Sequence, residues 1–255
     1  SLTTGVSGNL PVTNLGSGTS ASASTFWRGD GIWAVPTGAG TVQSVATDTS
    51  MYGGPITASG TLGIAVPLLP QGRLTLTTAV GVTTADVLAA TTVYYTPVAG
   101  LYLPVYDGTR FLNVSIGSEL SFALDSDSGH TNYHQASKNY DVFRANVSSV
   151  YYIGTGPQWN AGGVAGSDVA RGTGAGSTEL EMYQGVLVNK NSMLLRHGSS
   201  SGNTVTVPAR QGTYLGSFRT NASNGQTEDS FAKRFLFNAY NQTLRMGRKI
   251  DTGST

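Results

Sequence analysis

Short stretches in which apolar and polar residues alternate run through most of the chain. Alternation with a period of two is typical of strands that bury one face, and Gly, Asn, Asp and Pro separate the stretches. Nine stretches carry this pattern most clearly: 73–77, 91–95, 101–105, 110–116, 150–153, 185–189, 193–196, 204–207 and 213–218. Short strands at such spacing predict an all-β chain with a β-sandwich or barrel-like domain.

The segment 228–240 allows two interpretations. Phe231, Phe235 and Ala239 have the spacing of one face of a helix. Phe235, Phe237 and Ala239 have the spacing of one face of a strand. We favour a strand, because the surrounding Ser, Thr and Gly residues are poor helix formers.

The N-terminal part, residues 1–40, predicts a connector that ends in an aromatic hairpin. A run of Gly, Ser, Thr and Ala precedes Phe26 and cannot form a core of its own. Asp30-Gly31 is a two-residue hairpin signal that places Trp27 and Trp33 on the two arms. So small a hairpin cannot bury two indoles, so we expect these aromatic side chains to pack against another surface or another copy of the chain.

Two further parts follow the connector. Residues 41–66 predict a short β module around a Gly-Gly-Pro turn, and residues 67–255 predict a larger all-β domain. Within the larger domain, eight Gly residues between positions 154 and 178 predict a long loop. Such a loop is uncommon in a compact domain unless it binds a partner or is ordered by a neighbouring chain.

Charged residues make up only 11% of the 255-residue chain, against about 25% in an ordinary domain. The net charge of +1 includes no basic stripe, which disfavours double-stranded nucleic acid as a partner. The absence of Cys excludes disulfides, thiol nucleophiles and Cys zinc sites. No stretch approaches the ~18 apolar residues of a membrane helix, so we expect no membrane insertion. Because the chain opens with Ser1 and not Met, we expect a fragment or a processed chain.

Two pairs of side chains have the spacing of metal ligands. His130 and His134 lie four residues apart and share a face of either a helix or a strand. Asp125 and Asp127 alternate ahead of a Gly, as in the first half of a calcium loop. The twelfth position of that loop is Ala136, where an EF-hand needs Glu. We therefore interpret all four as polar loop residues and predict no metal and no cofactor.

Acidic pairs also raise the question of glycoside hydrolysis. Glu179 and Glu181, like Asp125 and Asp127, could be drawn as a pair of catalytic carboxylates. Residues two apart on a strand share a face in any case, so their proximity carries no information. The sequence also lacks a Gly-x-Ser-x-Gly nucleophile motif. We predict no catalytic residue and no enzymatic activity.

Three aromatic residues near polar loops are candidates for contact with a receptor. Tyr133, Trp159 and Tyr183 could stack on the sugar rings of a glycan. Aromatic side chains more often fill cores and interfaces between copies, which is the alternative for each of them. We expect Trp159 to be the most exposed, because Gly-rich sequence surrounds it.

Several motifs carry a resemblance to a known family. The sequence from Gly8 to Gly18 and the Phe-Trp-Arg-Gly-Asp-Gly motif at Phe26 resemble a connector of bacteriophage tail-fibre and related virion proteins. The stretches 40–45 and 53–62 resemble the repeat module of the same proteins, and the remainder resembles a β domain that recurs in phage structural proteins. The resemblance implies a non-enzymatic homotrimeric fibre located on the virion.

The implied partners are other copies of the chain, other virion proteins (a tail adaptor or the capsid), and a host-surface glycan or outer-membrane component. Phe26, Trp27 and Trp33 would then serve virion docking or trimer packing. Gly-rich and Ser-rich modules bury too little surface per chain to fold alone, which favours a shared axis independently. A capsid head-fibre or decoration protein is the alternative, and a polysaccharide-degrading spike with two carboxylates in a groove is a second one.

Overall fold

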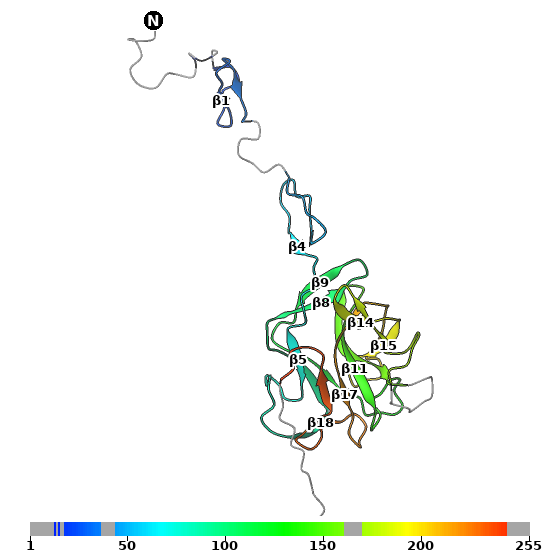
Figure 1. Cartoon of the computed structure of the whole chain (residues 1–255). Helices are drawn as coiled ribbons and strands as arrows, with labels where there is room; N and C mark the ends of the chain where they lie inside the picture. The colour runs from blue at the N-terminus through cyan, green and yellow to red at the C-terminus, as the bar shows by residue number, and fades with distance from the viewer. Residues whose placement is uncertain (1–12, 14, 16–17, 37–43, 161–169, 244–255) are drawn as a thin grey trace, which may run out of the picture. The chain divides into compact units, whose positions relative to one another are not determined.

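The computed structural model describes residues 13, 15, 18–36, 44–160 and 170–243. These residues contain nineteen strands and no α-helix, which confirms the prediction of an all-β chain (Figure 1). Contacts divide the chain into two compact units, Ser1–Gly63 and Ile64–Thr255. No helix in the described ranges is long and apolar enough to cross a membrane.

The N-terminal unit contains two small hairpins. In the first, β1 (Phe26–Trp27) pairs with β2 (Trp33–Ala34), and Trp27 lies opposite Trp33 as expected. The turn centres on Gly29 and Asp30 rather than on Asp30-Gly31, because the Gly31 N–H donates to the Arg28 carbonyl and Gly31 itself has a φ of +81°. A turn followed by a left-handed Gly is the usual form of a longer hairpin loop.

The second hairpin pairs β3 (Met51–Tyr52) with β4 (Gly63–Ile64). Val45 forms an isolated bridge with Ile56. A strand was expected at 41–45, and residues 41–43 lie outside the described ranges. The connector motif from Gly8 to Gly18 also lies largely outside them.

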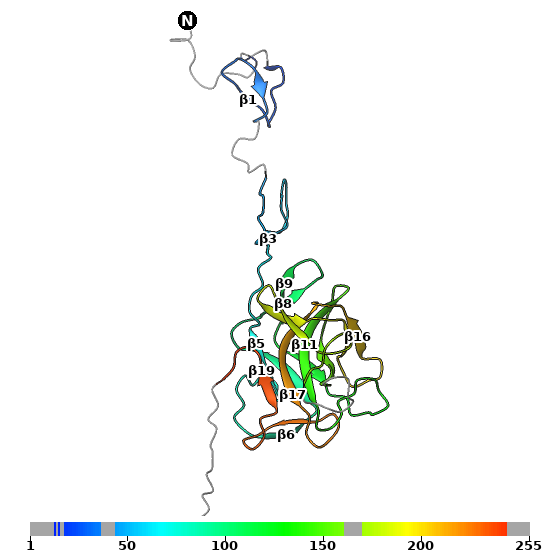
Figure 2. The same ribbon diagram turned by 45° about the vertical axis from the view of Figure 1, so that its right-hand side comes forward.

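The C-terminal unit is organised around one large antiparallel sheet. Its strands follow the order β13-β14-β17-β11-β12-β15-β16. Strand β19 pairs with β17, and Figure 2 shows β19 and β17 beside β11. The bounds of these strands are β11 Asn139–Val147, β12 Val150–Gln158, β13 Leu180–Tyr183, β14 Val186–Asn189, β15 Met193–Arg196, β16 Thr204–Val207, β17 Gly212–Arg219 and β19 Leu236–Asn238.

Smaller sheets cover one face of the large sheet. They are β10-β7-β5, β8-β9 and β18-β6. Their bounds are β5 Gly72–Thr75, β6 Val87–Ala90, β7 Thr92–Pro97, β8 Tyr102–Tyr106, β9 Phe111–Ser115, β10 Leu120–Ala123 and β18 Thr227–Asp229. Leu74, Val93 and Leu103 from the small sheets pack with Tyr140 and Phe218 of the large sheet in the main core. The two layers of strands enclose this main core, and a second cluster with Phe143, Leu195 and Tyr214 packs among the strands of the large sheet.

The predicted long loop at 154–178 is only partly a loop. Strand β12 continues to Gln158 through Gly154 and Gly156. A side chain at Gly154 would collide with the backbone of Arg196, and one at Gly156 with the Thr178 side chain. Close packing in the strand therefore requires both glycines. In the sequence, the same glycines had indicated part of a loop.

Candidate functional site

A cleft of about 650 Å³ lies in the C-terminal unit and is here named the polar cleft. Polar side chains dominate its lining: Asn132, Tyr133, Gln135, Gln158, Arg171 and Thr173. The 130–135 turn supplies one wall, the end of β12 supplies the floor, and residues 171–177 supply the opposite wall. Amides, hydroxyls and an aromatic ring that converge on one hollow are the groups that bind sugars through hydrogen bonds and ring contacts.

Arg171 forms the wall between this cleft and a second hollow. Its Nε donates to Asp141 Oδ2 at 2.6 Å and its Nη2 donates to Asp141 Oδ1 at 3.2 Å. The guanidinium also lies 4.5 Å from the ring centre of Trp159. Burial lowers the pKa of Arg171, but the bonds to the fully buried Asp141 outweigh it and raise that pKa, so the side chain is a fixed cation.

A network of hydroxyl groups holds the Asp141 carboxylate in turn. Ser217 donates to Asp141 Oδ1 at 2.6 Å, and the Tyr214 hydroxyl lies 2.7 Å from the Ser217 hydroxyl. Arg171 Nη2 donates to the Tyr214 hydroxyl as well, at 3.2 Å. Its Nη1 has no partner among the residues that the structure describes, and the Arg171 side chain is 31% exposed. The partly exposed guanidinium is thus held rigidly by a buried carboxylate.

The second hollow, of about 350 Å³, is named the arginine groove. Its lining combines three arginines with aromatic rings: Arg171, Arg219, Arg234, Trp159, Phe235 and Phe237. Direct pairing between β11, β17 and β19 puts Asn139, Ser217 and Phe237 on one face of the sheet, opposite the face that packs in the core. The groove therefore lies on the face opposite the main core, the same face on which Phe143 and Tyr214 pack farther along the strands in a second core cluster.

The three aromatic residues predicted to contact a receptor lie in different parts of the unit. Tyr133 lines the polar cleft, and Trp159 lines the adjoining arginine groove. Trp159 is half-buried rather than exposed, because Arg171 covers its ring. Tyr183 belongs instead to an aromatic cluster with Tyr106, whose ring centre is 5.2 Å away, and with Phe111. Tyr183 is half-buried in this cluster and lines neither the polar cleft nor the arginine groove.

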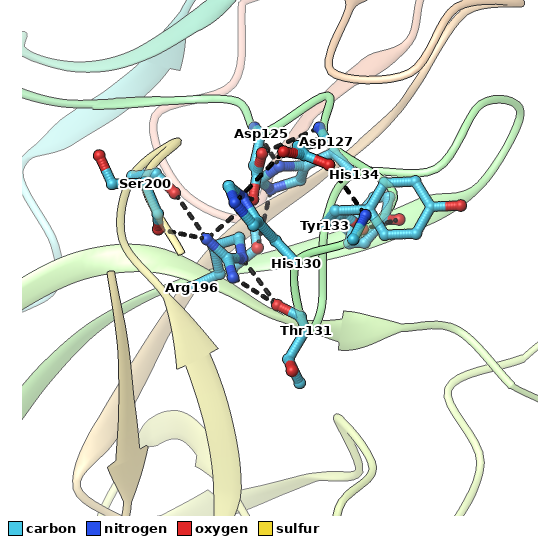
Figure 3. A network of polar contacts seen from close by, with 12 residues as sticks. Asp125, Asp127, His130, Thr131, Tyr133, His134, Arg196 and Ser200 are labelled. Atoms are coloured by element: carbon cyan, nitrogen blue, oxygen red, sulfur yellow. Dashed lines mark hydrogen bonds and ion pairs between the residues drawn. The ribbon is translucent and has the colours of Figure 1, made fainter. Parts of the chain in front are cut away.

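The residues considered as metal ligands form a network around a buried arginine (Figure 3). Arg196 and Asp125 are 0% and 1% exposed, and Arg196 Nη1 lies 2.9 Å from Asp125 Oδ2. The same carboxylate oxygen lies 2.9 Å from His130 Nδ1, and His130 Nε2 lies 3.3 Å from Asp127. Arg196 also donates to the backbone carbonyls of Thr131, Gly198 and Ser200. The arginine thereby ties the 125–134 loop to the turn after β15.

His134 completes this network as a neutral imidazole. The backbone N–H of Asp125 donates to His134 Nδ1 at 2.8 Å, so Nε2 carries the proton and faces Thr155 Oγ1 at 3.0 Å. The pKa of His134 is lowered to about 3, mainly by burial and in part by the nearby Arg196, against the opposing effect of Asp125. His130 and His134 do not face each other across a shared strand, because both lie in a loop. No group of three His, Asp or Glu side chains suited to a metal is present in the described ranges.

The acidic pairs are held by cations outside the polar cleft. Glu179 Oε1 pairs with Lys190, and Glu181 Oε1 lies 2.7 Å from Arg210 Nε. Asp125 is occupied by Arg196, as described above. No Asp or Glu is among the described residues that line the polar cleft. The geometry therefore brings no pair of carboxylates to either hollow.

The aromatic hairpin is exposed in the single chain. Phe26 is 47% exposed, and the half-buried Trp27 and Trp33 contact each other with ring centres 5.6 Å apart. Trp33 Nε1 donates to the Leu15 carbonyl. Arg28 and Asp30 form an exposed ion pair within the turn. The two indoles stabilise the hairpin but leave one face of it uncovered.

Arg171, Asp141 and Arg196 were not singled out from the sequence. Asp141 could have been noticed as a carboxylate between the apolar residues Tyr140 and Val142. The two arginines carry no local signal, because their partners come from strands distant in sequence. Comparisons with protein-family models, with curated proteins and with solved structures give no match for this chain.

Proposed function

We propose that the chain is a subunit of a trimeric bacteriophage virion fibre that binds a glycan of the bacterial surface. The observation that carries the proposal is the polar cleft, whose wall and floor present amide, hydroxyl and tyrosine groups from Tyr133, Gln158 and Thr173. Its volume of about 650 Å³ is in the range of sites that hold small ligands. Three shallow clefts on one fibre would give strong attachment through many weak contacts.

The N-terminal unit supports the fibre part of the proposal. None of its described residues, 13–63 with gaps, is buried in the single chain. Exposed apolar side chains there include Phe26, Ile32, Val35 and Met51. A unit without a core of its own gains stability when copies of it, or another virion protein, cover these side chains. The low content of charged residues suits contact between identical chains, since like charges would otherwise face each other.

A binding assay with cell-surface polysaccharides tests the glycan part. Purified full chain is applied to immobilised bacterial capsular and lipopolysaccharide glycans, together with the variant Tyr133→Ala. Removing the ring from the cleft should weaken binding about 10-fold, as expected for an aromatic anchor. Tyr102→Ala, which removes an exposed ring of β8 outside the cleft, is the matched control and should bind as the unchanged chain does. If Tyr133→Ala binds the glycans as tightly as Tyr102→Ala does, the proposed site is wrong.

A further inference from the structure

We propose that the glycan is acidic and that the arginine groove binds one of its carboxylates. This inference rests on the proposed function and adds the chemical class of the ligand. The groove presents the guanidinium groups of Arg171, Arg219 and Arg234, and no Asp or Glu is among its described lining residues. Planar guanidinium groups match the geometry of a carboxylate better than any other side chain does.

The acidic partners of these arginines lie beneath the surface. Asp141 is fully buried below Arg171, and Asp229 is 1% exposed at 3.5 Å from Arg234 Nη1. The guanidinium groups of Arg171 and Arg234 therefore face carboxylates that a ligand cannot reach. The accessible surface is cationic, although the buried carboxylates offset part of its charge. Arg171 and Arg234 are 31% and 42% exposed, so both can be reached from the groove.

Aromatic rings stand beside these cations. Phe237 is 54% exposed on the outer face of β19, and Phe235 precedes the same strand. An exposed ring on a regular strand provides a flat apolar platform, and the neighbouring arginines provide hydrogen-bond donors at its edge. A uronic acid has the matching pair of features, since its sugar ring has apolar C–H faces and it carries one carboxylate.

The hollows adjoin one another through shared lining residues, which suits a polymer rather than a single sugar. Arg171 lines both the polar cleft and the arginine groove. Arg234 and Phe237 line both the arginine groove and a third hollow of about 320 Å³. A linear polysaccharide can thus place neutral residues in the polar cleft and an acidic residue in the groove.

The test compares each glycan with its own carboxyl-reduced form. Bacterial capsular and lipopolysaccharide glycans that contain uronic acids are immobilised natively and after reduction of their carboxylates to alcohols. The full chain should bind the native form about 10-fold more tightly, because charge-assisted hydrogen bonds are lost on reduction. Raising the salt concentration should reduce the difference in affinity between the native and the reduced glycan.

Variants locate the effect in the groove. Arg234→Gln should remove most of the preference for the native form over the reduced form. Arg110→Gln, which removes an exposed arginine of the β8–β9 turn, should keep the full preference. Arg219→Gln should also reduce the preference for the native glycan over the reduced one, as a second and independent test. Urea unfolding of each variant shows whether the C-terminal unit keeps its stability.

Three results would overturn the inference, and they differ in meaning. Equal binding to native and reduced glycans would show that the ligand is not acidic, while the proposed function stands. Failure to bind any glycan in either form would contradict the proposed function itself. Loss of trimers in Arg234→Gln with an unchanged preference would identify the groove as a contact between copies of the chain.

Discussion

We expect the buried His134 to make folding stability depend on pH. In the folded chain its pKa is lowered to about 3, mainly by burial, whereas an unfolded histidine titrates near 6.5. The unfolded state therefore binds more protons between these values, so folding stability is complete above about pH 6.5 and falls as the pH drops towards 3. The expected slope is about 1.4 kcal/mol per pH unit within that window.

Urea unfolding at several pH values between 7 and 5 measures this slope. The window avoids the titration of most carboxylates, although the lowered pKa of His197 adds a smaller slope of the same sign. His134→Gln should flatten the profile, because the titrating group is gone. His130→Gln, in the same network but partly exposed, is the control and should keep the slope. A steep profile in His134→Gln would contradict the assignment.

Arg196 leads to a second prediction, on the cost of breaking a buried ion pair. Arg196→Met leaves the Asp125 carboxylate inside the protein without its main cation and leaves the Thr131 carbonyl without its donors. The free energy of unfolding should fall by about 3–5 kcal/mol, as for other broken buried pairs. Urea unfolding at pH 7 measures the change.

The pair of Arg210 and Glu181 is the matched control, because it joins the same kinds of side chain at the surface. Arg210→Met should change the stability little, since solvent screens an exposed pair. Similar losses in the two variants would show that the Arg196 network is not the stabilising feature described here.

Residue chemistry could be predicted only in part. His130, His134, Asp125 and Asp127 do cluster, as their short separation in sequence suggested, and the network they form includes a cation. Arg196 could not be foreseen, because it lies more than sixty residues from Thr131, to which it donates. Pairing of strands, and not local sequence, brings such partners together.

Gly216 controls how β19 docks on the large sheet. It has a φ of +156°, and a side chain there would collide with the carbonyl oxygen of Phe237. Gly216→Ala should lower the free energy of unfolding by about 1–3 kcal/mol, through backbone strain and displacement of β19. Because β19 carries Phe237, glycan binding should weaken as well. Chemical unfolding and the polysaccharide assay measure the two effects.

Gly202→Ala is the control for that substitution. Its site is open, since nothing lies within 4 Å of an added side chain. We expect it to leave stability and binding nearly unchanged. If Gly216→Ala were equally neutral, the docking of β19 would not depend on this close approach.

Strands with clear alternation were predictable, and others were not. The pattern predicted β15 at 193–196 and β16 at 204–207 with their observed bounds. It missed β11, where Asn139, Asp141 and Arg144 interrupt the apolar sequence. Asp141 bonds to Arg171 and Ser217, and Arg144 lies over the Tyr151 ring, so tertiary contacts accommodate polar residues that hid the strand from the pattern.

At the scale of the whole molecule, the aromatic hairpin is expected to hold the copies together. Replacing Phe26 and Trp27 by Ser should lower the mass in solution towards that of one chain, because the exposed apolar face of the hairpin is lost. Phe26→Leu keeps an apolar side chain and should preserve the assembly. Urea unfolding of the C-terminal unit should be the same in both variants, since its core lies within residues 64–255. Unchanged mass in the double variant would assign assembly to another surface.

The measurement that tests the fibre proposal most directly is the mass of the full chain in solution by light scattering. A trimeric fibre subunit predicts three times the chain mass of 26.4 kDa. The value should stay constant on dilution, as expected for chains that depend on each other for burial. A mass of 26.4 kDa at all concentrations would contradict the trimer and leave the exposed N-terminal unit without the partner copies that the account requires.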